Sequence, residues 1–167
     1  MSFKLPFNQG NRKTQLLVSL VILLLLAAFA TAARAGESYA SFGVGTTIVR
    51  GQAEMLSLDI TFPNAGPKDA DFRAGVVLAG ASEFRRNPQP SQAAFFVEVV
   101  DGFKKCDVGV GLAYLQNVDE YNGSNANFTL SLACRYKTLR ATLRHFSNAG
   151  TKMPNRGRDM LYVSYAF

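Results

Sequence analysis

Leu161-Tyr-Val-Ser-Tyr-Ala-Phe167 ends the chain and decides its fold class. Leu161, Val163, Tyr165 and Phe167 occupy every second position of this stretch. Because side chains of a strand point alternately to opposite faces, the pattern predicts a β-strand with one continuous apolar face. The last residue of the stretch is aromatic and belongs to the same apolar face.

The same two-residue period recurs upstream in short runs, separated by polar breaks that contain glycine and proline. Eight such runs are expected, at 38–49, 53–63, 71–80, 94–101, 104–116, 126–136, 138–147 and 159–167. No helical period persists after Gly36. The sequence therefore predicts an all-β domain of eight antiparallel strands over residues 36–167.

Residues 1–35 have the pattern of a cleavable signal peptide. A basic stretch at 4–13 precedes an apolar run at 16–28. Ala33-Arg-Ala35 is typical of a cleavage site, and Ala30-Thr-Ala32 is a second candidate. An uncleaved anchor helix is the alternative, because the apolar run is nearly long enough to span a bilayer. Either way, the chain is expected to be exported through the inner membrane of a Gram-negative cell.

Export and the C-terminal strand together predict a transmembrane barrel in the outer membrane. A terminal aromatic with apolar residues at alternate positions resembles the signal read by the barrel-assembly machinery, which is therefore an expected partner. Since lipid cannot satisfy unpaired backbone groups, the sheet must close, and side chains fill an eight-stranded lumen. The expected lumen residues carry both charges: Asp59, Arg73, Glu98, Asp107, Arg135, Arg140 and Arg144.

A soluble fold and nucleic-acid binding are two alternatives to a membrane barrel. A soluble periplasmic β-sandwich would also alternate, with its apolar face inward. The net charge is +6, but the 18 Lys and Arg residues are scattered, so nucleic-acid binding is not expected.

The two cysteines, Cys106 and Cys134, fall on one face of neighbouring strands and lie opposite each other if the hairpin is symmetric about residue 120. A disulfide in an oxidising compartment and two free thiols both fit this placement. Two cysteines and one histidine do not make a metal-ligand set, so neither metal nor cofactor is expected.

His145 and Ser147 share one face of the seventh predicted strand, at the end that leads into the longer 148–158 loop. Their parity is that of Leu139 and Leu143, which places a polar pair on the lipid face. Asp159 opens the next strand on the same face and supplies the acid of a Ser-His-acid triad. The alternatives are polar residues at the headgroup boundary and an ordinary aspartate at a loop end.

His145-Phe-Ser-Asn-Ala-Gly150, followed by Lys152 and Pro154-Asn155, resembles the lipid A 3-O-deacylase (PagL) family of eight-stranded outer-membrane barrels. The resemblance covers residues 145–159 and the C-terminal strand. It implies His145 as base and Ser147 as nucleophile. It also implies Asn155 in the oxyanion hole, with Asn148 and Gly150 shaping the site. The family's acid is a glutamate, where this chain has Asp159.

The expected function is therefore that of a serine esterase, removing the ester-linked 3-position acyl chain of lipid A in the outer leaflet. The basic residues Lys152, Arg156 and Arg158 are candidates for holding lipid A phosphates. Alternative functions are a non-catalytic barrel for adhesion or structure, and an outer-membrane phospholipase or acyltransferase. A second copy of the chain, giving a homodimer, is a further candidate partner.

Overall fold

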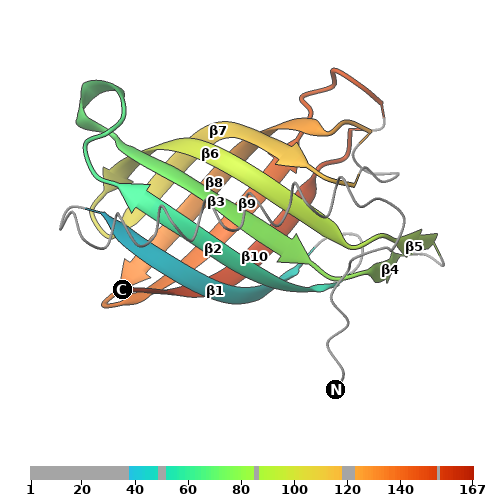
Figure 1. The fold of residues 1–167 in the computed structure, drawn as a ribbon, viewed down its shortest axis with the longest axis horizontal. Coiled ribbons are helices and arrows are strands. Elements are labelled where there is room, and N and C mark those ends of the chain that lie inside the picture. Colours follow the sequence, from blue (N-terminus) through green and yellow to red (C-terminus); the bar gives the residue numbers. More distant parts are fainter. Residues whose placement is uncertain (1–37, 49–51, 85–86, 118–122, 154) are drawn as a thin grey trace, which may run out of the picture.

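The computed structural model describes residues 38–48, 52–84, 87–117, 123–153 and 155–167. Within these residues, eight strands close into an antiparallel barrel, in the order β1-β10-β9-β8-β7-β6-β3-β2 (Figure 1). The barrel strands are β1 (Tyr39–Thr47), β2 (Glu54–Phe62), β3 (Asp71–Ala79), β6 (Gln92–Phe103), β7 (Cys106–Leu115), β8 (Ala126–Tyr136), β9 (Leu139–Ser147) and β10 (Arg158–Ala166). The predicted all-β class and eight-stranded barrel are confirmed. The predicted signal peptide lies outside the described residues.

Strand boundaries differ from the predicted runs around the β6–β7 turn. β6 is longer than the run at 94–101, and the run at 104–116 begins in a turn, because Lys104 adopts a left-handed φ of 57° that a strand cannot hold. A small sheet of β4 (Ser82–Phe84) and β5 (Asn87–Gln89) was not predicted. The short 3-10 helix η1 spans Pro67–Asp69, and no helix of the described part is long and apolar enough to span a membrane.

The barrel carries its apolar side chains outward and its polar side chains inward. Along β8, Phe128, Leu130 and Leu132 are 49%, 52% and 48% exposed, whereas Thr129 and Ser131 between them are each 1% exposed. This inversion is typical of barrels that span a lipid bilayer, where the outer wall faces hydrocarbon. It excludes the soluble sandwich, because a soluble sheet would bury its apolar face.

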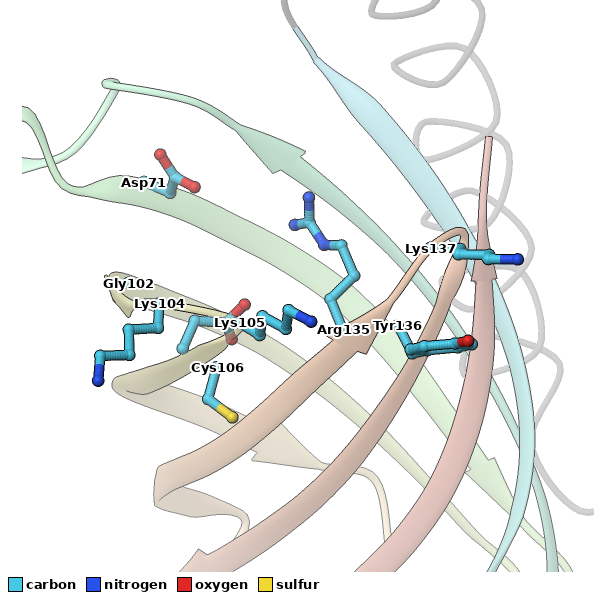
Figure 2. A pocket seen from close by; sticks show the side chains of 9 residues that line it. Asp71, Gly102, Lys104, Lys105, Cys106, Arg135, Tyr136 and Lys137 are labelled. Carbon is cyan, nitrogen blue, oxygen red and sulfur yellow. The ribbon is translucent and has the colours of Figure 1, made fainter.

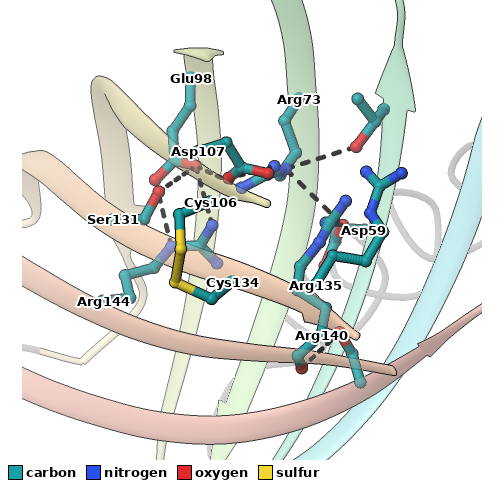
Figure 3. Close-up of polar contacts among 12 residues, drawn as sticks. Asp59, Arg73, Glu98, Cys106, Asp107, Ser131, Cys134, Arg135, Arg140 and Arg144 are labelled. Atoms are coloured by element: carbon teal, nitrogen blue, oxygen red, sulfur yellow. Dashed lines mark hydrogen bonds and ion pairs between the residues drawn. A yellow bond between two sulfur atoms is a disulfide. The ribbon is translucent and has the colours of Figure 1, made fainter. Parts of the chain in front are cut away.

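Glu98 lies at the centre of a charged network that fills the lumen (Figure 3). Arg144 donates to both of its carboxylate oxygens, at 3.1 and 2.9 Å, and Thr129 and Ser131 donate at 2.8 and 3.0 Å. The Arg144 guanidinium also lies 3.5 Å from the centre of the Phe96 ring. With its hydrogen bonds satisfied, this buried pair holds β6, β8 and β9 together across the barrel.

A second set of ion pairs lies nearer the C-terminal end of the lumen. Arg73 Nη2 lies 2.9 Å from Asp107, and Arg140 Nη1 lies 3.5 Å from Asp59. The predicted lumen residues thus face inward with both signs paired. Arg135 differs, because it is exposed at the open mouth of the barrel and its Nη2 donates to Tyr39 Oη at 2.7 Å, not to a carboxylate.

Replacing Arg144 by methionine is expected to destabilise the barrel by about 3–5 kcal/mol, because Glu98 would then be a buried carboxylate without its main partner. Urea unfolding of the refolded protein in detergent measures the loss. The double variant with Glu98→Gln should recover part of it, and Lys152→Met, at an exposed cation, should stay within about 0.5 kcal/mol of wild type. Wild-type stability of Arg144→Met would show that the network does not hold the fold.

The two cysteines form a disulfide between β7 and β8. Cys106 and Cys134 are direct cross-strand partners, as the hairpin symmetry predicts. The structure therefore decides between the bridge and the two free thiols in favour of the bridge, which cross-links this hairpin close to the β6–β7 turn.

The barrel has two different ends. The turn end carries the short turns at 104–105 and 137–138 and the C-terminus, and the loop end carries the longer connection at 148–157 (Figure 1). The short turns and the C-terminus thus share an end, as the predicted topology requires, and β9 runs from the turn end towards the loop end.

Candidate active site

His145 and Ser147 lie on the outer wall of the barrel, at the loop end of β9. Their cross-strand neighbours on β8 are Leu130 and Phe128, both outward-facing and exposed. His145 and Ser147 are each half-buried, unlike the fully buried Phe146 between them. The pair therefore interrupts an otherwise apolar wall at one edge.

Asp159 lies directly opposite His145 in the pairing of β9 with β10. Its Oδ1 is 2.7 Å from His145 Nδ1, and the two side chains are 30% and 39% exposed. Direct opposition in an antiparallel ladder brings the side chains within reach, so the shorter aspartate contacts the imidazole without the extra methylene of glutamate. This contact fixes the ring and leaves Nε2 as the nitrogen available to a nucleophile.

The Ser147 hydroxyl donates a hydrogen bond to Asn155 Oδ1 at 3.0 Å. The backbone N–H of Asn148 donates to the same oxygen at 3.1 Å. A backbone N–H can only donate, so the atom of the Asn155 amide that faces Asn148 and Ser147 must be the acceptor Oδ1. The Nδ2 group of Asn155 is therefore directed away from Ser147. Among the described residues no hydrogen bond joins Ser147 to His145, so the hydroxyl must rotate towards the imidazole before proton transfer.

Asn148 organises the loop that follows the nucleophile. Its side chain is fully buried, its Oδ1 accepts from Gly150 N at 3.0 Å, and its Nδ2 donates to the backbone oxygen of Lys152 at 2.6 Å. Gly150 has a φ of +79°, which glycine adopts readily. These bonds hold the first turn of the loop in place directly after Ser147.

The three basic candidates for phosphate binding do not lie together. Lys152 and Arg156 are exposed in the loop. Arg158 is instead the first residue of β10, opposite Phe146, and only 6% exposed. The expectation that Arg158 extends from the loop is therefore wrong: the strand begins one residue earlier than predicted, and its alternation turns Arg158 into the lumen.

Gly157 contacts the candidate site, although in the sequence it is only part of a loop break. Its φ is +65°, and a Cβ built on it would overlap His145 Cε1 and lie 2.7 Å from Nε2. The backbone of Gly157 therefore packs on the edge of the imidazole that must face the nucleophile. A glycine just before a strand carries no such signal in the sequence, because the contact depends on how the loop folds.

Replacing Gly157 by alanine is expected to lower activity by about 10- to 100-fold, because the methyl group displaces the imidazole by a fraction of an ångström to one ångström. Gly150→Ala is the matched comparison, since it has a similar φ of +79° but nothing within 4 Å of its Cβ. Rates of fatty-acid release from both variants separate backbone strain from contact with the ring. Equal losses in the two would contradict the assigned contact.

An apolar hollow of about 510 Å³ lies in the outer wall, lined mainly by Phe95, Val97, Leu112 and Tyr114. Leu112 pairs with Phe128, which pairs with Ser147, so one cross-strand row joins the hollow to the nucleophile. Hydrophobic surface of this kind suits an acyl chain beside Ser147. No cluster of His, Cys, Asp or Glu able to hold a metal ion occurs in the described ranges.

Comparison with known proteins supports the fold and the family resemblance. A model of the lipid A 3-O-deacylase (PagL) family matches residues 105–167, which contain every candidate site residue. Among solved structures, the "Crystal structure of the outer membrane enzyme PagL" is 19% identical, with a TM-score of 0.52, and the match covers 77% of this chain and 98% of that chain. At this identity the likeness establishes the fold alone. A search of curated proteins found no match. The resemblance predicted from residues 145–159 and the C-terminal strand is confirmed and extends upstream to Lys105.

Proposed function

On the basis of this site and the resemblance to the lipid A 3-O-deacylase (PagL) family, we propose that the chain is an outer-membrane serine esterase. Its substrate is lipid A, from which it removes the ester-linked acyl chain at the 3-position. The single observation that carries the proposal is the bond of 2.7 Å between His145 and Asp159, two residues from Ser147 on an apolar outer wall. A headgroup-boundary role for the polar residues does not require this arrangement.

The reaction begins when His145 Nε2 takes the proton of the Ser147 hydroxyl as its oxygen attacks the ester carbonyl. Asp159 holds the imidazole through Nδ1 and stabilises its positive charge. The side-chain amide of Asn155 turns to bring Nδ2 towards the acyl carbonyl and, with a backbone N–H, stabilises the tetrahedral oxyanion. The imidazolium then protonates the departing sugar oxygen, which leaves as a hydroxyl group, and a water molecule activated by the same histidine releases the fatty acid from Ser147.

The position of the site favours a lipid substrate. Ser147 faces outward at the loop end, where the wall on its β8 side is Phe128 and Leu130. With the turn end in the periplasm, the loop end lies at the depth of the outer leaflet, where lipid A resides. An acyl ester can then approach laterally from the bilayer, with its chain along the apolar row towards the hollow. Lys152 and Arg156 extend from the adjoining loop and are the proposed contacts for the lipid A phosphates.

A phospholipase on the same scaffold is the second candidate, because the apolar wall suits any acyl chain. Purified protein in detergent micelles, offered lipid A and phosphatidylethanolamine at equal concentration, distinguishes the two. The proposal predicts release of a 3-hydroxy fatty acid from lipid A alone, and no release by Ser147→Ala. Release of unsubstituted fatty acid from the phospholipid would favour the phospholipase, and no release from either by a folded barrel would favour a non-catalytic role.

Signal cleavage, export through the inner membrane, insertion by the barrel-assembly machinery and a homodimer are further predictions from the sequence. Mass determination of the mature chain extracted from outer membranes addresses the first two, with a mature N-terminus at Gly36 as the expected result.

A further inference from the structure

Three connections at the turn end, all within the described ranges, each place a lysine in the left-handed backbone region. Lys68 lies between β2 and β3, Lys104 between β6 and β7, and Lys137 between β8 and β9, with φ values of 54°, 57° and 56°. Glycine or asparagine adopts this conformation at a lower cost. Backbone geometry therefore does not account for lysine at these positions, and the charged side chains need another explanation.

Two of these turns border a hollow of about 420 Å³ at the mouth of the barrel (Figure 2). Four of its described lining residues are cations: Lys104, Lys105, Arg135 and Lys137. Figure 2 shows Lys104 and Lys105 on one side, and Arg135, Tyr136 and Lys137 on the other. The Cys106–Cys134 disulfide joins the strands that carry the two groups. The four cations thus lie at one end of a cross-linked part of the barrel, where Lys105 extends towards Arg135 and the side chains of Lys104 and Lys137 extend away from each other on either side.

Two carboxylates also line the hollow, but each has a partner. Asp107 Oδ1 accepts from Arg73 Nη2 at 2.9 Å, and Asp71 Oδ1 accepts from the backbone N–H of Asn64 at 3.2 Å. The arginine on Asp107 comes from the lumen and is not one of the four cations that line the hollow. The hollow therefore retains an excess of positive charge that suits an anionic group.

The outer wall beside the hollow is aromatic. Phe103 and Tyr136 are 72% and 67% exposed, among the most exposed large apolar side chains of the described residues. Lys104 Nζ lies 5.3 Å from the centre of the Phe103 ring, and Lys137 Nζ lies 5.7 Å from that of Tyr136. A ring facing hydrocarbon with a cation above it matches the boundary between acyl chains and headgroups. A soluble anion would need no such rings.

We propose that this hollow binds the phosphate of an anionic phospholipid, in the leaflet opposite the candidate active site. Lys105 contacts the phosphate, Lys104 and Lys137 on either side add positive charge at the level of the headgroup, and Phe103 and Tyr136 pack against the acyl chains. Basic pockets between membrane-spanning elements bind acidic headgroups in this way. The proposal requires only that the barrel spans a bilayer, and it stands whether or not Ser147 hydrolyses lipid A.

The test compares thermal unfolding in phosphatidylcholine vesicles with and without phosphatidylglycerol, using full-length mature protein that carries Ser147→Ala to prevent hydrolysis. Loss of the heat-resistant gel mobility of the folded barrel reports the unfolding temperature. Phosphatidylglycerol is expected to raise this temperature by about 2–6 °C. The triple variant Lys104→Gln, Lys105→Gln, Lys137→Gln should lose the rise and unfold as its parent does in pure phosphatidylcholine, because glutamine has a similar length and the same backbone cost.

Two control experiments identify the source of the rise in unfolding temperature. Lys68→Gln removes a turn-end lysine of similar φ, 54°, that does not line the hollow, and should leave the rise intact. Inorganic phosphate alone, added to the protein in neutral detergent, should give no comparable rise. Absence of a rise in the parent, its persistence in the triple variant, its loss in Lys68→Gln, or an equal rise with inorganic phosphate would each overturn the proposal.

Discussion

Ser147→Ala is expected to lower the rate of lipid A deacylation by about 10⁴- to 10⁶-fold, the range seen when a serine hydrolase loses its nucleophile. Alanine removes the only atom that forms the acyl-enzyme, while the half-buried position at the loop end of β9 tolerates the smaller side chain. The barrel should remain folded, because the hydroxyl bonds only to Asn155 and the backbone N–H of Ala149 among the described residues. Fatty-acid release under single-turnover conditions measures the loss.

Ser124→Ala is the control for this variant. Ser124 also lies at the loop end and is half-buried, but it belongs to the connection before β8. The deacylation rate of Ser124→Ala should stay within about twofold of wild type, as for a surface substitution away from the site. A folded Ser147→Ala protein with wild-type activity would remove Ser147 from the mechanism, whatever the effect at Ser124.

Asp159→Asn is expected to lower the rate by about 10⁴-fold with little change in structure. The amide has the shape of the carboxylate, but it no longer stabilises the imidazolium, and its NH₂ group favours the wrong tautomer of His145. Rates of fatty-acid release, compared at equal amounts of folded barrel, measure this effect.

Asp159→Glu tests whether the departure from the family's glutamate limits activity. The carboxylate of Asp159 already lies 2.7 Å from Nδ1 across a direct strand pair, so an added methylene has to be accommodated by displacing the ring or the strand. Glutamate should therefore retain more activity than asparagine but fall below wild type, by on the order of 10- to 100-fold. A Glu variant faster than wild type would contradict the inferred fit of aspartate, and an Asn variant at full rate would remove the carboxylate from the mechanism.

The barrel was predictable from the sequence because its physical cause is local. Alternation along a strand, as at Phe128, Leu130 and Leu132 in β8, indicates which face contacts lipid. This pattern does not depend on which strands lie beside it. The β4–β5 hairpin was not predictable in this way. Its strands have three residues each, too few to establish a period, and Pro88 lies within the second.

The candidate site was predictable in part for the same reason. The i, i+2 spacing places His145 and Ser147 on one face, and parity adds Asp159. The inward direction of Arg158 and the contact of Gly157 with the imidazole depend on where the 148–157 loop ends and how it folds, which spacing alone does not determine. Predicting the disulfide requires the register of β7 with β8, which follows from the sequence only if the hairpin is symmetric.

The central claim is that Ser147, served by His145 and Asp159, removes one acyl chain from lipid A. Mass spectrometry of lipid A from cells that produce the wild-type chain, beside cells that produce equal amounts of folded Ser147→Ala, tests it most directly. The account predicts that wild-type cells lose one 3-hydroxyacyl chain from lipid A and that the variant cells keep it. Unchanged lipid A in both, with the wild-type barrel folded in the outer membrane, would contradict the claim.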